Sequence, residues 1–261
     1  MIMTSTDPAI NVDDVTMAYG SYVVQEGLNF AVNKGEIFII MGDSGSGKST
    51  LLKNMIGLNK PAKGAITYGG KSLWSNDEAE RLALMRSFGV LYQSGALWSS
   101  MTIAENVSLP LATYTDYSTS DIADIVAFKL SLVGLSGFED FYPSEISGGM
   151  KKRAGLARAM SLDPDILFFD EPSAGLDPIS SHRLDELILE LRDSLGTTIV
   201  VVTHELASIF TIGDRAVFVD ADAKTQTALG TLDDLVASPP TEKIAEFLNR
   251  GATKQHKEVG A

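Results

Sequence analysis

A short apolar run, a glycine-rich loop and a helix-like stretch follow one another from residue 35 to residue 58, and this succession strongly limits the possible folds. The run GEIFIIM (35–41) is rich in β-branched residues, and residues 42–50 match the pattern G-x-x-x-x-G-K-[ST]. A strand, a loop and a helix in this order direct backbone N–H groups and the positive end of a helix into one concavity. The sequence therefore predicts a phosphate-binding loop, and the alternative is a merely flexible glycine-rich turn.

The predicted loop supplies most of the candidate ligand-binding residues. Lys48 is expected to reach the β- and γ-phosphates, and the Ser49 hydroxyl is expected to bind Mg²⁺. The residues of the loop that we assign to nucleotide binding are Gly42, Ser44, Gly45, Ser46, Gly47, Lys48, Ser49 and Thr50.

Two further apolar runs predict buried strands, DILFFDEP (165–172) and TTIVVVTHE (197–205). Between them, leucines and isoleucines recur at helical spacing, with Pro178 near the start of the stretch and Gly196 past its end. A strand, a helix and a strand in this order form a crossover between parallel strands. The sequence therefore predicts an α/β fold with a parallel sheet.

Two adjacent acids, Asp170 and Glu171, end the first of these runs. This position puts their carboxylates at the carboxyl edge of the sheet, where open α/β sheets bind ligands. We expect Asp170 to hold Mg²⁺ through water, and Glu171 to polarise the water that attacks the γ-phosphate. Solvated acids at the end of a strand are the structural alternative.

The remaining segments predict the parts that surround this core. Residues 12–34 suggest two antiparallel strands broken at Gly20, and residues 214–230 suggest a closing hairpin. Residues 96–162 have helical periodicity without a convincing strand. In the tail, residues 241–250 place Ile244, Phe247 and Leu248 on one helical face, and residues 251–261 are polar.

Charge and composition exclude several classes of protein. A net charge of -13 argues against binding to nucleic acid, which proteins meet with clustered Lys and Arg. The chain has no cysteine, which excludes disulfides and zinc-thiolate sites and suits a reducing compartment. It has no apolar run long enough to span a bilayer and no signal-like start, so we expect it to stay in the cytosol.

Residues 145–153 (EISGGMKKR) closely resemble the signature motif of the ABC transporter ATP-binding subunits, with Met150 where glutamine is commonest. Taken alone, this stretch also fits a basic helix capped by Ser147. Its place just before the acidic strand is the place that the family requires. The resemblance extends from about residue 12 to residue 237.

The resemblance implies further site residues. Gln93 and His204 correspond to the Q-loop glutamine and the switch histidine, which we assign to catalysis with Glu171, and Gln93 is also a metal ligand. Tyr19 resembles the aromatic residue that stacks on adenine, although a plain tyrosine at a strand end is the alternative. The signature residues Ser147, Gly148 and Gly149 are expected to bind the ATP held by another copy of the chain, and Asp177 of the D-loop (173–177) is also expected to bind the nucleotide.

The family fold is a P-loop NTPase core of the RecA-like type with a mixed sheet, an N-terminal antiparallel β subdomain and an inserted α-helical subdomain. It implies one ATPase domain over residues 10–240. Residues 12–95 and 163–237 would form the core with the β subdomain, and 96–162 the helical subdomain. Residues 241–261 would form a C-terminal helix and polar tail.

The stretch YQSGALW (92–98), followed by Met101 and Thr102, is similar to that of the ATPases of Mla-type systems, which move phospholipids with MCE-domain proteins. Ordinary core packing by Leu97 and Trp98 is the alternative. The resemblance implies ATP and Mg²⁺ as ligands, hydrolysis coupled to transport, and a place on the cytoplasmic face of the inner membrane. The implied partners are a second copy of the chain, integral-membrane permease subunits, an MCE-domain protein and a small cytoplasmic regulatory subunit.

Three other functions remain open at this point. The chain could serve a transporter for another cargo, or act as an ABC-type ATPase on DNA or ribosomes, or bind nucleotide without turnover. The second class carries long coiled-coil insertions or two cassettes, whereas this chain has one phosphate loop. The third class would be expected to lack Glu171 or His204, and both are present.

Overall fold

The apolar runs form the centre of a six-stranded sheet in the computed structural model, which describes residues 8–75 and 77–249. The strand order is β10-β9-β3-β8-β7-β6. Neighbouring strands pair in parallel, except that β10 is antiparallel to β9, so the predicted mixed sheet is confirmed. The strands are β3 (Ile37–Met41), β6 (Phe88–Leu91), β7 (Ile166–Asp170), β8 (Thr198–Val202), β9 (Arg215–Asp220) and β10 (Thr225–Thr231).

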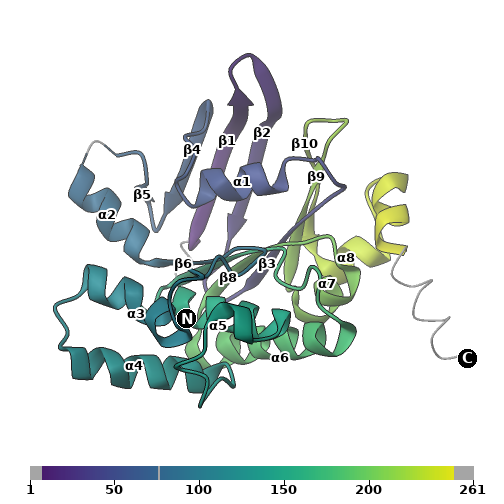
Figure 1. Cartoon of the computed structure of the whole chain (residues 1–261). Helices are drawn as coiled ribbons and strands as arrows, with labels where there is room; N and C mark the ends of the chain where they lie inside the picture. Colours follow the sequence, from purple (N-terminus) through teal and green to yellow (C-terminus); the bar gives the residue numbers. More distant parts are fainter. Residues whose placement is uncertain (1–7, 76, 250–261) are drawn as a thin grey trace, which may run out of the picture.

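The central strands β3, β7 and β8 are almost entirely apolar because both faces of the sheet are covered. In β3, Ile37, Ile39 and Met41 pack into a cluster on the face that the helices cover. Phe38 and Ile40 point to the opposite face and pack against strands and a helix from the first half of the chain. The continuous hydrophobic runs of the sequence thus mark the middle layer of three (Figure 1).

A second, antiparallel sheet covers the other face, in the order β2-β1-β4-β5. Its strands are β1 (Ile10–Tyr19), β2 (Tyr22–Val32), β4 (Lys63–Tyr68) and β5 (Lys71–Ser72). The predicted pair of strands corresponds to β1 and β2, and the chain turns at Gly20, which has a φ of 59°. The strands β4 and β5 were not predicted from the sequence. The first half of β4 is exposed and β5 has only two residues, so neither has a clear apolar pattern.

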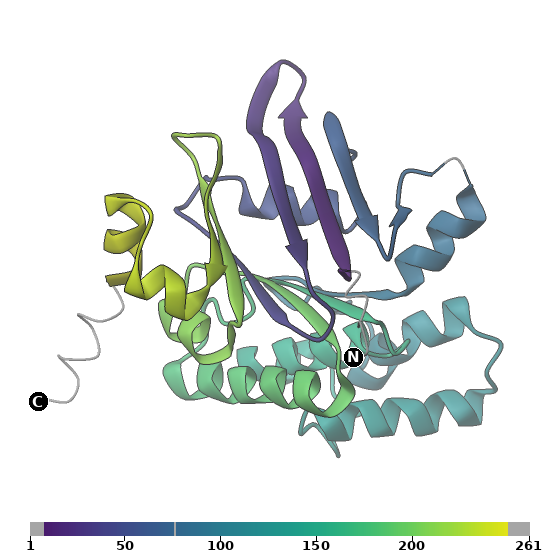
Figure 2. The ribbon, with the colours of Figure 1, turned by 180° about the vertical axis from the view of Figure 1, so that it is seen from behind.

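Most helices cover one face of the six-stranded sheet, and α1 (Lys48–Met55) packs in the same core as the antiparallel sheet on the other face. The bounds of the other helices are α2 (Glu78–Arg86), α3 (Ile103–Tyr114), α4 (Thr119–Leu132), α5 (Gly148–Ala159), α6 (Pro178–Leu195), α7 (Leu206–Ile212) and α8 (Leu232–Ala237), with a 3-10 helix over Pro143–Glu145. Helices α3 to α7 lie on the face of the six-stranded sheet opposite to the antiparallel sheet (Figures 1 and 2). Within residues 8–75 and 77–249, no helix combines the length and the apolar character needed to cross a bilayer.

The helices begin and end where side chains satisfy their free backbone groups. Thr102 and Glu105 form a capping box at the start of α3, and Asp177 caps α6. Helix α6 ends at Gly196, whose φ of 66° is the left-handed value that favours glycine, as the sequence predicts. Residues 96–162 are all described and contain helices but no strand. Their treatment as a separate subdomain stays a prediction.

The C-terminal segment packs as its periodicity predicts. Residues 242–249 are helical, and Ile244, Phe247 and Leu248 are buried in the helix-covered core. The ring of Phe247 meets that of Phe218 on β9 edge to face, with centroids 5.2 Å apart. The polar tail 251–261 lies outside the described residues.

A glycine on β6 generates the first testable prediction. A Cβ atom at Gly89 would overlap the carbonyl oxygen of Ala159 at the end of α5 and lie 2.6 Å from Leu167 Cδ2. We expect Gly89→Ala to lower the free energy of unfolding by about 1–3 kcal/mol, because backbone at the clash cannot move as a side chain can. Urea titration measures this change.

The matched control is Gly230→Ala on β10, where a Cβ atom would meet Leu235 at an ordinary 3.7 Å. Equal midpoints for the two variants would contradict the close approach of α5 to β6.

Candidate functional site

The predicted phosphate loop leaves the end of β3 and enters α1. Gly42, Gly45 and Gly47 have φ values of 149°, 79° and 92°, a region that favours glycine. A Cβ atom at Gly42 would overlap the carbonyl oxygen of Val219, and one at Gly47 would lie 2.8 Å from Val24 Cγ1. The glycines therefore let the loop pass close to both sheets.

Lys48 lies inside this loop. Its ammonium donates hydrogen bonds to the carbonyl oxygens of Gly42 and Asp43, both at 2.9 Å, and the residue is 8% exposed. Burial lowers the pKa of Lys48, and the nearby carboxylates of Glu171, Asp43 and Asp170 oppose this shift. The Ser46 hydroxyl is buried without a hydrogen-bond partner among the described residues. A buried cation and an unused donor in one concavity suit an anionic ligand.

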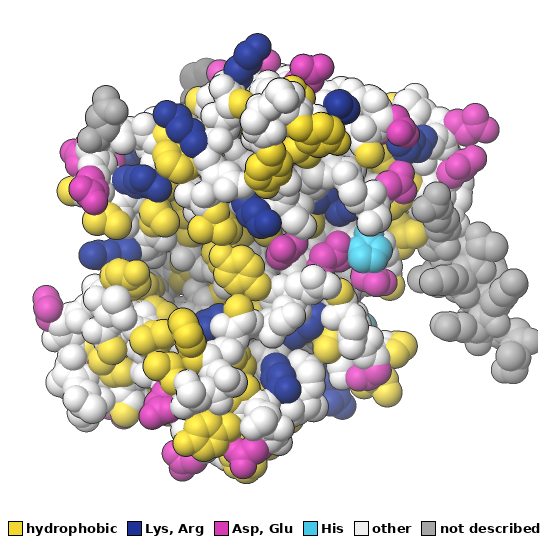
Figure 3. All heavy atoms as spheres, turned by 45° about the horizontal axis from the view of Figure 1, so that its top comes forward, with side chains coloured by type: hydrophobic (Ala, Val, Ile, Leu, Met, Phe, Trp, Pro, Cys, Tyr) yellow, Lys and Arg dark blue, Asp and Glu magenta, His cyan; other side chains and the backbone are white. Residues whose placement is uncertain are grey.

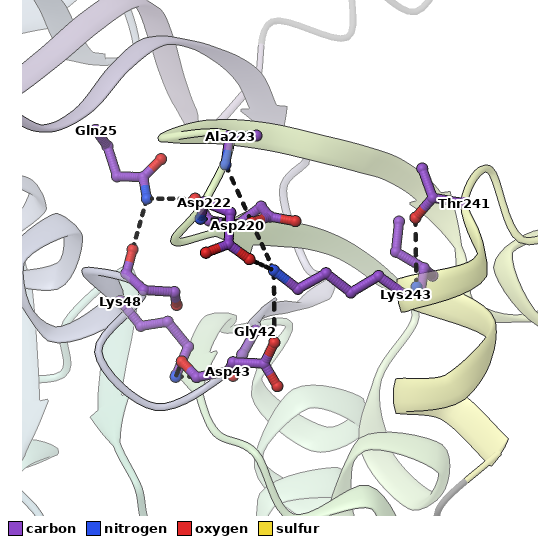
Figure 4. Close-up of polar contacts among 11 residues, drawn as sticks. Gln25, Gly42, Asp43, Lys48, Asp220, Asp222, Ala223, Thr241 and Lys243 are labelled. Atoms are coloured by element: carbon purple, nitrogen blue, oxygen red, sulfur yellow. Dashed lines mark hydrogen bonds and ion pairs between the residues drawn. The ribbon is translucent and has the colours of Figure 1, made fainter.

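Residues from distant parts of the chain hold the loop from outside (Figure 4). Gln25 on β2 donates to the carbonyl oxygens of Ser46 at 2.7 Å and of Asp220 at 2.9 Å. Lys243, from the C-terminal helix, pairs with Asp220 at 2.7 Å and approaches Asp43 of the loop at 3.8 Å. The sequence analysis missed Gln25, Asp220 and Lys243, because no local pattern ties them to the loop.

The predicted metal ligands Ser49 and Asp170 come together across the sheet edge. The Ser49 hydroxyl, at the start of α1, donates to Asp170 Oδ1 at 3.4 Å. Burial and the neighbouring Glu171 raise the pKa of Asp170, while Ser49, Lys53 and Lys48 lower it. A hydroxyl and a carboxylate are oxygen donors of the kind that Mg²⁺ prefers.

Glu171 is held by its backbone and by a histidine. Its φ of 49° is rare for a residue with a side chain, and its N–H donates to the carbonyl oxygen of Val202 at 2.8 Å. Its Oε1 lies 2.7 Å from Nδ1 of His204, which follows β8. Its Oε2 is buried and has no partner among the described residues. The carboxylate is thus oriented by one oxygen and has the other available to accept a proton.

The signature residues lie on helix α5, in the layer opposite to α1 (Figure 1). The Ser147 hydroxyl caps α5 by accepting from the N–H of Met150 at 3.2 Å. Asp177 caps α6 and accepts from the hydroxyl of Ser180, and these hydrogen bonds lower its pKa. A Cβ atom at Gly149 would meet Ser180 at 3.4 Å. Ser147, Gly148, Gly149 and Asp177 therefore make local contacts and are not drawn into the loop of their own chain.

Gln93 and Tyr19 are both exposed and lie at or just after the end of a strand. Gln93 follows β6 and is exposed. Tyr19 ends β1, is 54% exposed, and its hydroxyl accepts from Asn59 at 3.3 Å. An exposed ring on a strand end is available for stacking.

The residues after Gln93 divide between two environments. Leu97 packs against the core, as the structural alternative predicted. Trp98 is 60% exposed, and only its backbone is fixed, by hydrogen bonds to Asn106. Core packing therefore does not explain Trp98.

Lys48, Lys53 and Lys243 supply basic side chains near the loop although the chain as a whole is acidic. The face in Figure 3 carries Lys and Arg side chains among acidic and hydrophobic ones, in a chain of net charge -13. Lys53, one turn into α1, adds to the field of Lys48 at Asp170. The positive field that an anion needs is therefore local.

The sequence matches the family model described as ABC transporter over residues 25–174. It is 42% identical over 207 residues to the probable ribonucleotide transport ATP-binding protein mkl of Mycobacterium tuberculosis, a match that covers 79% of this chain and 58% of that protein. The chain thus spans less than two thirds of that relative's length. It is 40% identical over 239 residues to the intermembrane phospholipid transport ATP-binding protein MlaF of Haemophilus influenzae, covering 92% of this chain and 89% of that one.

The fold is also that of solved cassettes. The dimeric structure of a bacterial ABC transporter cassette superposes with a TM-score of 0.77 and 28% identity, over 85% of this chain and 98% of that one. The same cassette has been solved in a post-hydrolysis state bound to ADP and Pi. The predicted P-loop NTPase fold is confirmed by these neighbours.

A buried carboxyl group supports the turn behind Glu171. Asp185 on α6 is 3% exposed, and its Oδ2 accepts from the hydroxyl of Ser208 on α7 at 2.9 Å. Ser208 lies 3.3 Å from the hydroxyl of Ser173, two residues after Glu171. Burial raises the pKa of Asp185 to about 6, against the lowering effect of Ser208 and His182. The sequence analysis missed this network, whose members lie on three separate segments.

Asp185 generates a pH-dependent prediction. Between about pH 4 and pH 6 the folded chain keeps a proton on Asp185 that the unfolded chain has lost. The contribution of protonated Asp185 to the free energy of unfolding is fully present below about pH 4 and is lost as pH rises through 6. The loss amounts to at most roughly 3 kcal/mol. We expect the free energy of unfolding of Asp185→Asn, relative to wild type, to rise over this interval.

Urea titrations at several pH values measure this difference. Asp124→Asn, which changes an exposed carboxylate on α4, is the control and should leave the pH profile unchanged. Parallel profiles for wild type and Asp185→Asn would show that Asp185 does not titrate in this range.

Proposed function

This chain belongs to the ABC transporter family, and from that premise we propose that it is the ATP-binding and ATP-hydrolysing subunit of a transporter. The observation that carries the proposal is the convergence of three groups at one sheet edge. These are the loop around Lys48, the carboxylates of Asp170 and Glu171, and His204, bonded to Glu171 at 2.7 Å.

The loop fits the phosphates of ATP. Its glycines leave room for close approach, Lys48 supplies a buried cation, and the Ser46 hydroxyl has an unused donor. Mg²⁺ would be held by Ser49, Asp170 and Gln93 together with phosphate oxygens, and its chemistry would be to neutralise charge on the β- and γ-phosphates. Tyr19 would stack on the adenine ring.

Glu171 would act as the base. His204 bonds one carboxylate oxygen and so orients the other, which is buried without a partner, toward an attacking water. The unusual φ of 49° turns the Glu171 side chain out of the alternation of β7. Nothing in this arrangement supports the alternative of nucleotide binding without turnover, since both groups are present and in contact.

The complete site would be shared between two copies of the chain. Ser147, Gly148, Gly149 and Asp177 contact their own helices and lie apart from the loop of the same chain. In a closed pair, Ser147 and the N–H of Gly149 would contact the γ-phosphate of the ATP held by the other copy and complete its charge-stabilising shell. The dimeric form of the neighbouring cassette supports this arrangement.

The proposed cargo is phospholipid. Relatives named for phospholipid transport match 92% of the chain, whereas those named for ribonucleotide transport match 79% of the chain and are much longer. The proposed partners are integral-membrane permease subunits, an MCE-domain protein and a small regulatory subunit, on the cytoplasmic face of the inner membrane. The exposed Trp98 after Gln93 is a contact point for the permease. A transporter for another cargo is the alternative.

Replacing Glu171 tests the catalytic assignment. Glu171→Gln keeps the shape of the side chain but removes the base, so ATP turnover should fall by about 10²–10⁴-fold while ATP affinity persists. With ATP trapped, light scattering should show the 27.9 kDa chain shifting toward twice its mass.

Two variants serve as controls in this experiment. Glu190→Gln, an exposed carboxylate on α6, should turn over ATP as wild type does, and Lys48→Ala should lose ATP binding itself. Near-normal turnover by Glu171→Gln would refute its role as the base. A mass that stays at that of the monomer with ATP bound would refute the shared site.

The cargo is tested by purifying the chain with its membrane partners from detergent and identifying the bound small molecules by mass spectrometry. We expect phospholipid in the assembled complex and a higher ATPase rate there than in the acidic chain alone. A complex that retains only ribonucleotide or another non-lipid cargo would overturn the phospholipid proposal and leave the ATPase proposal intact.

A further inference from the structure

Lys152 is a buried cation that the catalytic scheme does not use. It lies on α5 and is 5% exposed. Its ammonium donates to the carbonyl oxygens of Pro172 at 2.5 Å, Ala174 at 2.6 Å and Glu171 at 3.4 Å. An ammonium has three donors and no acceptor, so these carbonyls use its full capacity.

The three carbonyls belong to the turn that carries the proposed base. This turn follows β7, starts at Glu171 with its left-handed backbone, and closes with a hydrogen bond from Ala174 N to Glu171 O at 3.2 Å. Its carbonyl dipoles converge on one point. Without a cation at that point the carbonyls would repel one another, and those of Pro172 and Ala174 would lose the hydrogen bonds that Lys152 donates.

The same helix is fixed to the segment that follows Gln93. The guanidinium of Arg158 donates to Ala96 O at 2.7 Å and to Gly95 O at 2.9 Å. A Cβ atom at Gly155 would lie 2.9 Å from Gly95 O, so helix and segment are in backbone contact. Lys152, Gly155 and Arg158 are three residues apart and share one side of α5.

Helix α5 therefore joins three parts of the candidate site. It begins at Gly148 behind the cap Ser147, holds the turn of Glu171 through Lys152, and holds the segment after Gln93 through Arg158. A twelve-residue helix moves as a rigid body, so a displacement of its first turn displaces the carbonyl anchor of the base as well.

We propose that Lys152 is a positioning residue that couples the two ATP sites of the dimer, by linking the signature turn at one site to Glu171 at the other within the same chain. This inference rests on the proposed shared site. In a closed pair, Ser147 meets the ATP of the partner while Glu171 serves the ATP of its own chain. Contact of Ser147 with the partner's ATP thus fixes the position of α5. Because Lys152 ties the turn of Glu171 to α5, the position of Glu171 is fixed as well.

Lys152→Met tests the coupling, because it keeps the apolar stem and removes the ammonium. In the full-length chain we expect kcat to fall at least tenfold, with the KM for ATP changed less than about threefold and the Hill coefficient moving toward 1. ATP affinity of the isolated chain should stay unchanged, since the three hydrogen bonds of Lys152 all go to the turn of residues 171–174 and not to the loop of residues 42–50.

The matched control is Lys129→Met. Lys129 on α4 is also buried and also hydrogen-bonded, to Asp163, but it lies away from both parts of the site. This variant should lose stability to urea without a change in the Hill coefficient. Equal kcat and Hill values for Lys152→Met and Lys129→Met would overturn the proposal.

A double-mutant cycle with Ser147→Ala separates coupling from local support of the turn. If Lys152 acts through the start of α5, the double variant should be at most about threefold slower than the slower single variant. Fold losses that multiply would overturn the coupling.

If Lys152→Met does not fold, Lys152→Gln, whose amide keeps two donors, replaces it and the same outcomes decide. If the wild-type chain itself has no ATPase activity, that result refutes the proposed function and not the coupling alone.

Discussion

The parallel pairing of β3, β8 and β7 places the phosphate loop, the acidic pair and His204. Ile40 pairs with Val202, and Val202 pairs in turn with Asp170, so the three strands end at one level. The phosphate loop, the acidic pair and the segment of His204 leave the sheet at this shared edge. A slip of one residue in β7 would turn Asp170 to the opposite face and remove it from Ser49.

Two buried ammonium groups organise the loops that start from this edge. Lys48 donates to carbonyls after β3, and Lys152 donates to carbonyls after β7. Where the chain leaves a strand its carbonyls lose their sheet partners, and a buried cation satisfies several of them at once. The same interaction offsets the cost of burying each charge. Lys48 retains a place for phosphate, whereas the donors of Lys152 are fully used.

The sequence predicted the strands β3, β7 and β8 of the central layer and the crossover helix α6 because their signals are local. A strand covered on both faces is apolar throughout, as in β3, and α6 ends at a glycine that its terminus requires. The strands β4, β5 and β6 and the helix α2 were not predicted. They lie at the rim, where exposed and buried residues mix and no residue of α2 is fully buried.

The sequence by itself determined the phosphate loop, the acidic pair and the signature, because each is a run of adjacent residues with a fixed local geometry. Only the tertiary structure decided which distant groups meet them. Gln25 contacts a carbonyl 195 residues away, and Lys152 finds its carbonyls about 20 residues along the chain. Any lysine carries the same three donors, and its partners are fixed only when helix and sheet pack together. Hydrogen bonds between distant segments follow from that packing and leave no pattern in the sequence.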